Sequence, residues 1–171
     1  MTREKLQEVV NDPREVIYFL SETPNVLGKG KDVTGCFCPP LERNPHGICV
    51  QLRQFFGGGN ADDYTSLHYE IEEYRKGLVV EIHSEMVEAH PSIHAFIYDQ
   101  FKEGHGLRFK GRERKGKLTV KKAYRFATIS INWRGQKLCD IIEDIKKAVT
   151  ELYQKYDGYL NYLEKYYLER G

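Results

Sequence analysis

The stretch LHYEIEEYRKGLVVEIH, residues 67–83, decides the fold, because apolar and polar residues alternate on both sides of a short basic turn. Alternation with a period of two is typical of a strand with one buried face, so two antiparallel strands joined through Arg75, Lys76 and Gly77 are predicted. The apolar positions are Leu67, Tyr69 and Ile71 before the turn and Leu78, Val80 and Ile82 after it. A slip of one residue would exchange the two faces, so only registers that pair apolar with apolar positions are expected.

The other face of this hairpin is predicted to be rich in histidine and glutamate. Registers that pair apolar positions bring together His68, Glu70, Glu72, Glu81 and His83. Such a group could bind a divalent cation or carry out acid–base chemistry, because both need several lone-pair donors at short range. In a metal-dependent hydrolase, the three glutamates and His83 would hold the ion and His68 would serve as the base. A solvated polar face of an antiparallel sheet accounts for the same pattern equally well.

Signals for helices and strands on either side of the hairpin predict a single α+β domain. The predicted segments are an N-terminal helical region at 1–30, first strands and hairpin at 48–83, a short helix at 90–103, a basic hairpin at 107–133 and a long helix at 137–168. Because no repeat or low-complexity linker separates them, we expect one antiparallel sheet packed against an N-terminal helix, a short central helix and a long C-terminal helix.

Capping residues mark the predicted starts of the two outer helices. Asp12 and Glu15 have the spacing of a capping box before the first apolar stripe. Asp140 and Glu143 have the same spacing at the start of the long C-terminal stripe. Gly158 could break that second helix, because glycine is a poor helix former.

Length and composition fit one folded domain. The chain has 171 residues, of which 40% are hydrophobic and 30% charged, with a formal net charge of +1. This is enough to bury a core without disulfides or metal, and it argues against disorder. No apolar run reaches membrane-spanning length, and MTREKLQEVV is typical of an amphipathic helix and not of a secretion signal. We therefore expect a cytoplasmic protein without membrane contact, whose cysteines stay reduced.

Three of the four cysteines lie within CFCPPLERNPHGIC, residues 36–49. The set that could hold a structural zinc ion is Cys36, Cys38, His46 and Cys49. Its residue types suit a Cys3His site, although zinc-binding cysteines are more often separated by two residues. The alternative is that the thiols pack as small apolar groups while the prolines shape a surface loop.

A strongly basic segment lies between Lys102 and Arg125. It holds ten Lys/Arg residues and two glutamates, a local balance of +8. A β-ribbon with this charge could contact nucleic acid or an acidic protein surface, or it could pair within the chain with the acidic stretch 62–88. The predicted contacts are Arg108, Lys110, Arg112, Arg114, Lys117, Lys121 and Lys122.

The order of these elements also resembles a known type of domain. The segment GLVVEIHSE, a helix ending in FKEG, a basic strand pair and a C-terminal helix together resemble an uncharacterised α+β domain found beside bacterial restriction-type nucleases, over roughly residues 48–155. The resemblance implies a nucleic-acid or defence setting and carries over no functional residues. His83 stands where such nucleases have a lysine, which argues against an active nuclease of that family.

The C-terminal helix is unusually rich in tyrosine. Its tyrosines are Tyr153, Tyr156, Tyr159, Tyr162, Tyr166 and Tyr167. They cannot all share one helical face, so either a second copy of the chain covers some of them in a homodimer or they pack internally.

Taken together, these patterns favour a small cytoplasmic binding or regulatory module, related to phage or bacterial defence, that engages nucleic acid or a nucleic-acid enzyme through its basic ribbon. No nucleophile elbow, phosphate-binding loop or dinucleotide fingerprint supports catalysis. Two alternatives stay open: the metal-dependent hydrolase or nuclease described above, and an oligomeric interaction protein that uses the tyrosine-rich helix.

Overall fold

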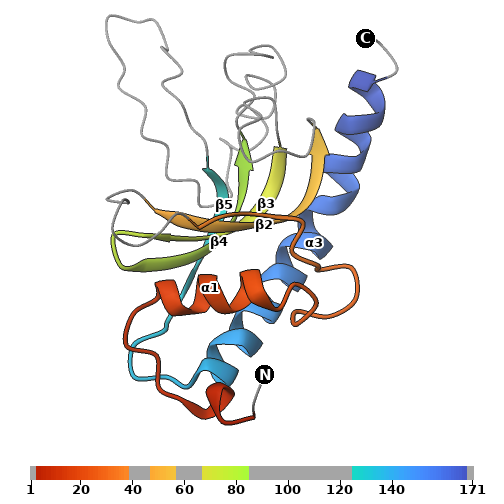
Figure 1. Cartoon of the computed structure of the whole chain (residues 1–171). Coiled ribbons are helices and arrows are strands. Elements are labelled where there is room, and N and C mark those ends of the chain that lie inside the picture. Colours follow the sequence, from red (N-terminus) through yellow and green to blue (C-terminus); the bar gives the residue numbers. More distant parts are fainter. Residues whose placement is uncertain (1–2, 39–46, 57–66, 85–124, 169–171) are drawn as a thin grey trace, which may run out of the picture.

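A computed structural model describes residues 3–38, 47–56, 67–84 and 125–168, and these residues form an α+β domain (Figure 1). Its strands are β1 (Gly35–Phe37), β2 (Ile48–Phe56), β3 (Leu67–Tyr74), β4 (Gly77–Ser84) and β5 (Arg125–Ile131). Its helices are the short η1 (Lys5–Gln7), α1 (Arg14–Glu22) and α3 (Leu138–Leu168). The predicted fold class is therefore confirmed. The predicted helix at 90–103 and most of the basic hairpin lie outside the described residues.

The described strands form one antiparallel meander in the order β1-β2-β3-β4-β5, so each strand pairs with its neighbours in sequence. The hairpin pairs apolar with apolar positions as predicted, since Tyr69 lies opposite Ile82 and Ile71 opposite Val80. Strands β3 and β4 are joined by a tight turn, through Arg75 and Lys76, whereas residues 85–124 separate β4 from β5.

The turn of the β3–β4 hairpin has an uncommon composition. Arg75 and Lys76 have φ angles of 51° and 63°, which is the left-handed region that two-residue hairpin turns require and glycine or asparagine usually supplies. Hydrogen bonds to the backbone N–H and to the carbonyl of Lys76 hold this conformation. The backbone N–H of Lys76 donates to Glu73 Oε1 at 2.7 Å, and Trp133 Nε1 donates to the Lys76 carbonyl at 3.0 Å.

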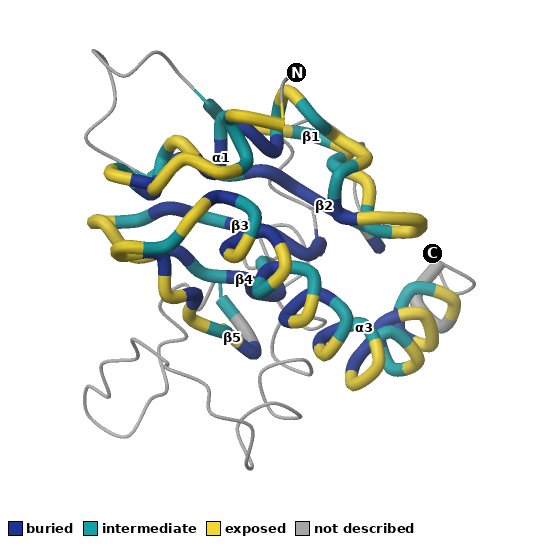
Figure 2. The backbone as a smooth tube through the Cα atoms, turned by 90° about the horizontal axis from the view of Figure 1, so that it is seen from below, coloured by how far each residue is buried: buried dark blue, intermediate teal, exposed yellow. Residues whose placement is uncertain are grey.

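One face of the sheet forms the core together with α1 and α3. The strand residues in this core include Ile48, Val50, Leu52, Tyr69, Ile71, Val80 and Ile82, and the helix residues include Val16, Ile17, Leu20, Ile141, Ile145 and Val149. Figure 2 shows mostly buried positions along β2, β3 and β4, whereas α3 alternates between buried and exposed ones. Each fully buried aliphatic side chain contributes about 1.5–3 kcal/mol relative to exposure.

Helix α1 begins with the predicted capping box. The backbone N–H of Arg14 donates to Asp12 Oδ1, and the backbone N–H of Asp12 donates to Glu15 Oε1, both at 3.0 Å. These bonds satisfy two donors that the helix itself leaves without partners, which fixes where the helix starts.

Helix α3 covers nearly the predicted segment 137–168, but two local expectations within it differ from the structure. It begins at Leu138, two residues before the expected cap at Asp140, and it continues through Gly158 without a break. Contacts with the sheet support the helix next to that glycine, because Asp157 accepts hydrogen bonds from Tyr69 Oη at 2.7 Å and from Arg53 Nη1 at 3.0 Å. Among the described residues, no helix is both long and apolar enough to cross a membrane.

Candidate metal centre

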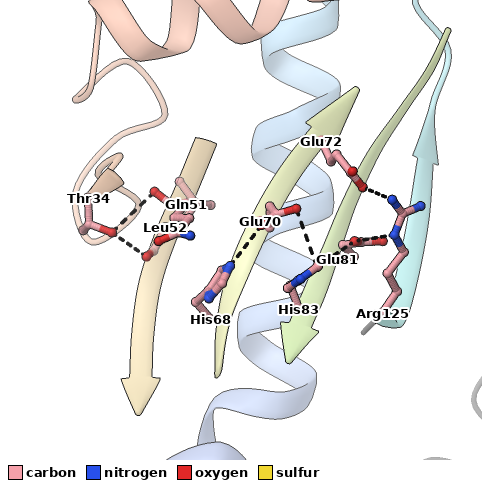
Figure 3. A network of polar contacts seen from close by, with 9 residues as sticks. All are labelled: Thr34, Gln51, Leu52, His68, Glu70, Glu72, Glu81, His83 and Arg125. Carbon is pink, nitrogen blue, oxygen red and sulfur yellow. Dashed lines mark hydrogen bonds and ion pairs between the residues drawn. The ribbon is translucent and has the colours of Figure 1, made fainter. Parts of the chain in front are cut away.

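The second face of the sheet, away from α3, carries a network of histidine, glutamate and arginine side chains (Figure 3). In the register of the hairpin, His68 lies opposite His83 and Glu70 lies opposite Glu81. The structure thus brings the predicted histidines and glutamates together. It does not place them on a solvated surface, however, since His68 and Glu81 are 0% exposed and Glu70 is 4% exposed.

Three of these side chains converge on one point. His83 Nδ1 lies 3.6 Å from Glu70 Oε1 and 3.5 Å from Glu81 Oε1. Among the described residues, Glu70, Glu81 and His83 form a group in which one potential ligand atom from each lies within 4.8 Å of the others. Glu81 Oε1 is buried and has no hydrogen-bond partner. The arrangement can therefore present two carboxylates and an imidazole to a single cation.

His68 lies beside this group and not in it. Its Nε2 is 3.0 Å from Glu70 Oε2, the carboxylate oxygen that faces away from His83, and its ring stacks on that of His83 with the centroids 5.3 Å apart. A completely buried imidazole in these contacts is suited to orienting the Glu70 carboxylate. This position does not support the predicted role of His68 as a catalytic base, which needs access to a substrate proton.

A β-bulge in β5 brings two further side chains to the group. Ala127 and Thr128 together oppose the single residue Glu81, and Ala127 has a φ of 51°. Because the extra residue shifts the alternation of side chains, Arg125 and Thr128 both reach the polar face although they are three positions apart. Arg125 Nε lies 3.3 Å from Glu81 Oε1, and Thr128 Oγ1 donates to Glu81 Oε2 at 3.2 Å.

The guanidinium of Arg125 also pairs with the third glutamate, Glu72. Its Nη2 forms an ion pair with Glu72 Oε2, and it stacks over the Tyr74 ring at 5.0 Å from the centroid. Arg125 is the last of the ten basic residues of the segment 102–125, and its ion pairs with Glu72 and Glu81 are of the kind expected if that segment pairs with the acidic stretch 62–88. The role of Thr128 was not predicted from the sequence.

The carboxylates influence one another electrostatically. Burial acts to raise the pKa of Glu70, but His83 and His68 outweigh it and lower that pKa to about 2. Burial raises the pKa of Glu72 to about 7, and the negative charge of Glu70 adds to the rise while Arg125 opposes it. Near neutral pH, Glu70 is thus ionised whereas Glu72 is close to its midpoint of protonation.

Strand β2 lies next to β3, on the side of the group opposite β4. Cys49 lies opposite Glu72 and Gln51 opposite Glu70. Burial, together with the charges of Glu70 and Glu72, raises the pKa of the Cys49 thiol, so this cysteine stays protonated and packs as an uncharged side chain.

The predicted zinc set is not assembled among the described residues. Cys36 lies opposite Val50, a residue of the core face, whereas Cys49 contacts the glutamates of the opposite face. Cys38 Sγ lies 3.6 Å from the carbonyl oxygen of Cys49, which is a backbone contact. His46 lies outside the described residues. A zinc site that uses all four residues is therefore not supported.

The other predicted contacts lie elsewhere in the chain. The seven basic residues expected to contact nucleic acid, Arg108, Lys110, Arg112, Arg114, Lys117, Lys121 and Lys122, are outside the described residues. On α3, Tyr156 is buried in the core and Tyr162 is 59% exposed, so the tyrosine-rich helix is partly covered within a single chain.

Comparisons with protein-family models, with curated proteins and with solved structures found no match for this chain. The resemblance to a domain beside restriction-type nucleases therefore stays a prediction. The function has to be inferred from the geometry and chemistry of the described residues.

Proposed function

We propose that the protein binds a divalent cation at Glu70, Glu81 and His83 on the polar face of its sheet. The observation that carries this proposal is the convergence of three potential ligand atoms within 4.8 Å. Oxygen and nitrogen ligands bind zinc at about 2.0–2.2 Å, so two ligands of one ion lie at most about 4.4 Å apart. Side-chain adjustments on the order of 1 Å would therefore bring the three atoms to bonding distance.

The charge of the group also supports a cation. Arg125 pairs with Glu72 and Glu81, whereas Glu70 lies beside the two histidines of the network. The group contains three carboxyl groups and one guanidinium, so a divalent ion would add positive charge beside acidic side chains. Buried charge is costly unless it is paired or coordinates a metal, so a group of this kind gains from binding an ion.

The ligand types favour a transition metal. Carboxylates suit Mg²⁺, Ca²⁺ and Mn²⁺, whereas imidazole suits Zn²⁺ and neighbouring transition metals. A mixed set of two carboxylates and one imidazole is therefore best matched by Mn²⁺ or Zn²⁺. An ion with three protein ligands keeps a coordination position for water, whose pKa it lowers, and this would supply the nucleophile of a hydrolase.

This proposal retains the metal ion of the hydrolase predicted from the sequence. It does not retain His68 as the catalytic base, since His68 orients Glu70. The charge of the segment 102–125 favours a phosphodiester such as nucleic acid as the substrate class. Nucleic-acid binding by that segment and dimerisation through the tyrosine-rich helix stay predictions, because the structure gives no observation that favours them over this site.

The test is the stoichiometry of Mn²⁺ binding by the full chain after removal of metals with a chelator. Mn²⁺ is the sharper probe because thiolates prefer zinc, so the cysteines would contribute little. We expect one ion per chain by native mass spectrometry and by the electron paramagnetic resonance signal of free Mn²⁺. Glu81→Gln should weaken binding at least on the order of tenfold, because it removes a charged ligand.

The matched control is Glu72→Gln, a glutamate of the same network that lies outside the three ligands. It should retain the ion with a modest loss of affinity from its removed charge. Equal affinity in the wild-type chain and in both Glu81→Gln and His83→Gln would contradict the proposal. Oligonucleotide hydrolysis that depends on Mn²⁺ and disappears in Glu81→Gln would extend the proposal from ion binding to catalysis.

A further inference from the structure

We infer that Arg125 is a built-in competitor of the cation, which occupies Glu81 when no ion is bound and is displaced from it when an ion binds. This inference rests on the proposed cation site and concerns what sets its affinity. It assigns to Arg125 a regulatory role at the site, distinct from that of a ligand.

The competition follows from a shared carboxylate oxygen. Glu81 Oε1 lies 3.3 Å from Arg125 Nε and 3.5 Å from His83 Nδ1. The same oxygen is the ligand atom through which Glu81 would reach an ion held with His83. A guanidinium and a divalent cation on one buried carboxylate repel each other strongly, because the protein interior screens charge less than water does.

Arg125 retains other partners when Glu81 binds an ion instead. Its Nη2 pairs with Glu72 and its guanidinium stacks over the ring of Tyr74. Figure 3 shows Glu72 and Glu81 joined to the guanidinium of Arg125 through different nitrogen atoms, Nη2 and Nε, so the contact with Glu72 does not need the one with Glu81. The half-buried side chain can therefore release Glu81 and stay paired, which makes the exchange between arginine and cation feasible.

The exchange depends on the bulge in β5. Without the extra residue at Ala127 and Thr128, the alternation of side chains would not place both Arg125 and Thr128 on the face of Glu81. Thr128 holds the other oxygen, Oε2, so Glu81 keeps its orientation while Oε1 changes partner. Since arginine stays protonated at all physiological pH values, the competition does not depend on the titration of Arg125.

The experiment compares Mn²⁺ affinity in wild-type protein, Arg125→Gln and the control Arg53→Gln. Arg53 is a matched control because it pairs with Asp157 at 3.0 Å and stacks over Phe55 at 4.9 Å, away from the glutamates of β3 and β4. We expect Arg125→Gln to bind Mn²⁺ on the order of tenfold more tightly than wild type, and Arg53→Gln to be unchanged. Equal or weaker binding by Arg125→Gln would overturn the inference.

A second measurement needs no variant and so does not depend on whether Arg125→Gln folds. Phenylglyoxal modifies accessible arginines, and peptide mapping by mass spectrometry follows Arg125 alone. Addition of Mn²⁺ should speed the modification of Arg125 and leave that of Arg53 unchanged. An unchanged rate at Arg125 with the ion bound would show that it is not displaced.

Failure of the proposed cation site and failure of the proposed competition would give different results. If neither wild type nor Arg125→Gln binds Mn²⁺, the proposed cation site itself is wrong, and the inference falls with it. If wild type binds the ion and Arg125→Gln binds it no more tightly, the site stands and only the competition is wrong. Binding by Arg125→Gln alone would support both.

Discussion

Glu70 and Glu81 lie directly opposite each other on β3 and β4, and both carboxylates are buried. Like charges at directly opposed positions destabilise a strand pair, and burial adds the cost of removing each carboxylate from water. The chain offsets this with His68, His83 and Arg125 around the pair. A bound cation would add to that compensation, so ion binding and folding stability should be coupled.

The first prediction concerns this coupling. A cation that binds only the folded state should raise the free energy of unfolding of the wild-type protein by about 2.7 kcal/mol when its concentration is about 100 times Kd. Glu81→Gln should lose most of this rise, because it removes one ligand. Urea denaturation with Mn²⁺ and with a chelator measures both values. The same rise in wild type and in Glu81→Gln would show that the ion stabilises the protein from another place.

The sequence predicted the faces and register of the β3–β4 hairpin because a period of two leaves little freedom once one face is apolar. It did not predict that the polar face is buried, since alternation alone does not reveal what covers a face. Pairing of the basic segment with the acidic stretch 62–88 was one alternative, but the particular pair of Arg125 and Glu81 was not predicted, for a more specific reason. Phe126 and Ile129 are both apolar but are spaced by three, and this break in the alternation was the available signal of a bulge.

Two other differences have tertiary causes. Gly158 weakens α3 locally, yet the contacts of neighbouring Asp157 with Tyr69 and Arg53 hold the helix against the sheet. Cys49 was grouped with Cys36 by closeness in sequence, whereas the pairing of β1 with β2 puts their side chains on opposite faces. Contacts between segments distant in sequence decide both features, and local patterns do not contain them.

The second prediction concerns Gly47, where the chain enters β2. A Cβ at this position would lie 2.4 Å from the carbonyl oxygen of Glu73 and 2.8 Å from Glu72 Oε1. The first of these atoms belongs to the backbone and cannot move aside cheaply. We therefore expect Gly47→Ala to lower the free energy of unfolding by about 1–3 kcal/mol, as measured by chemical denaturation.

Gly158→Ala is the control for this substitution. Its Cβ would meet no atom within 4 Å, and the residue lies inside α3. Alanine should here raise the free energy of unfolding by about 0.5–1 kcal/mol, because it is the better helix former. If both substitutions shift stability in the same direction, the close approach at Gly47 is not the cause.

The third prediction concerns the β3–β4 turn. Lys76 has a φ of 63°, a conformation that costs a non-glycine residue roughly 1–2 kcal/mol. Its contacts with Glu73 and Trp133 use backbone atoms, which glycine retains. Lys76→Gly should therefore raise the thermal midpoint of unfolding, and by the same reasoning Gly135→Ala, at a φ of 70°, should lower it. A lower midpoint for Lys76→Gly would mean that its side chain contributes more than the turn geometry costs.

The fourth prediction uses the pH dependence of the thiols. Burial raises the pKa of Cys38 to about 11, and the neighbouring Cys36 adds to the rise. Because only the thiolate reacts with iodoacetamide, a raised pKa means slow alkylation near neutral pH, with a rate that grows about tenfold per pH unit below the pKa. Between pH 8 and pH 10, the alkylation rate of Cys38 should thus increase on the order of a hundredfold.

Peptide mapping by mass spectrometry distinguishes the thiols in this experiment. Cys49 should remain the slowest, since burial and two nearby glutamates both raise its pKa. Cys36→Ser should speed the alkylation of Cys38, because it removes one cause of the raised pKa. Zinc needs thiolates, so added Zn²⁺ should give Cys38 and Cys49 little protection at pH 8. Strong protection of both thiols by zinc would instead support a metal site in the segment that begins at Cys36. Such a site would require His46 or another ligand near the two thiols.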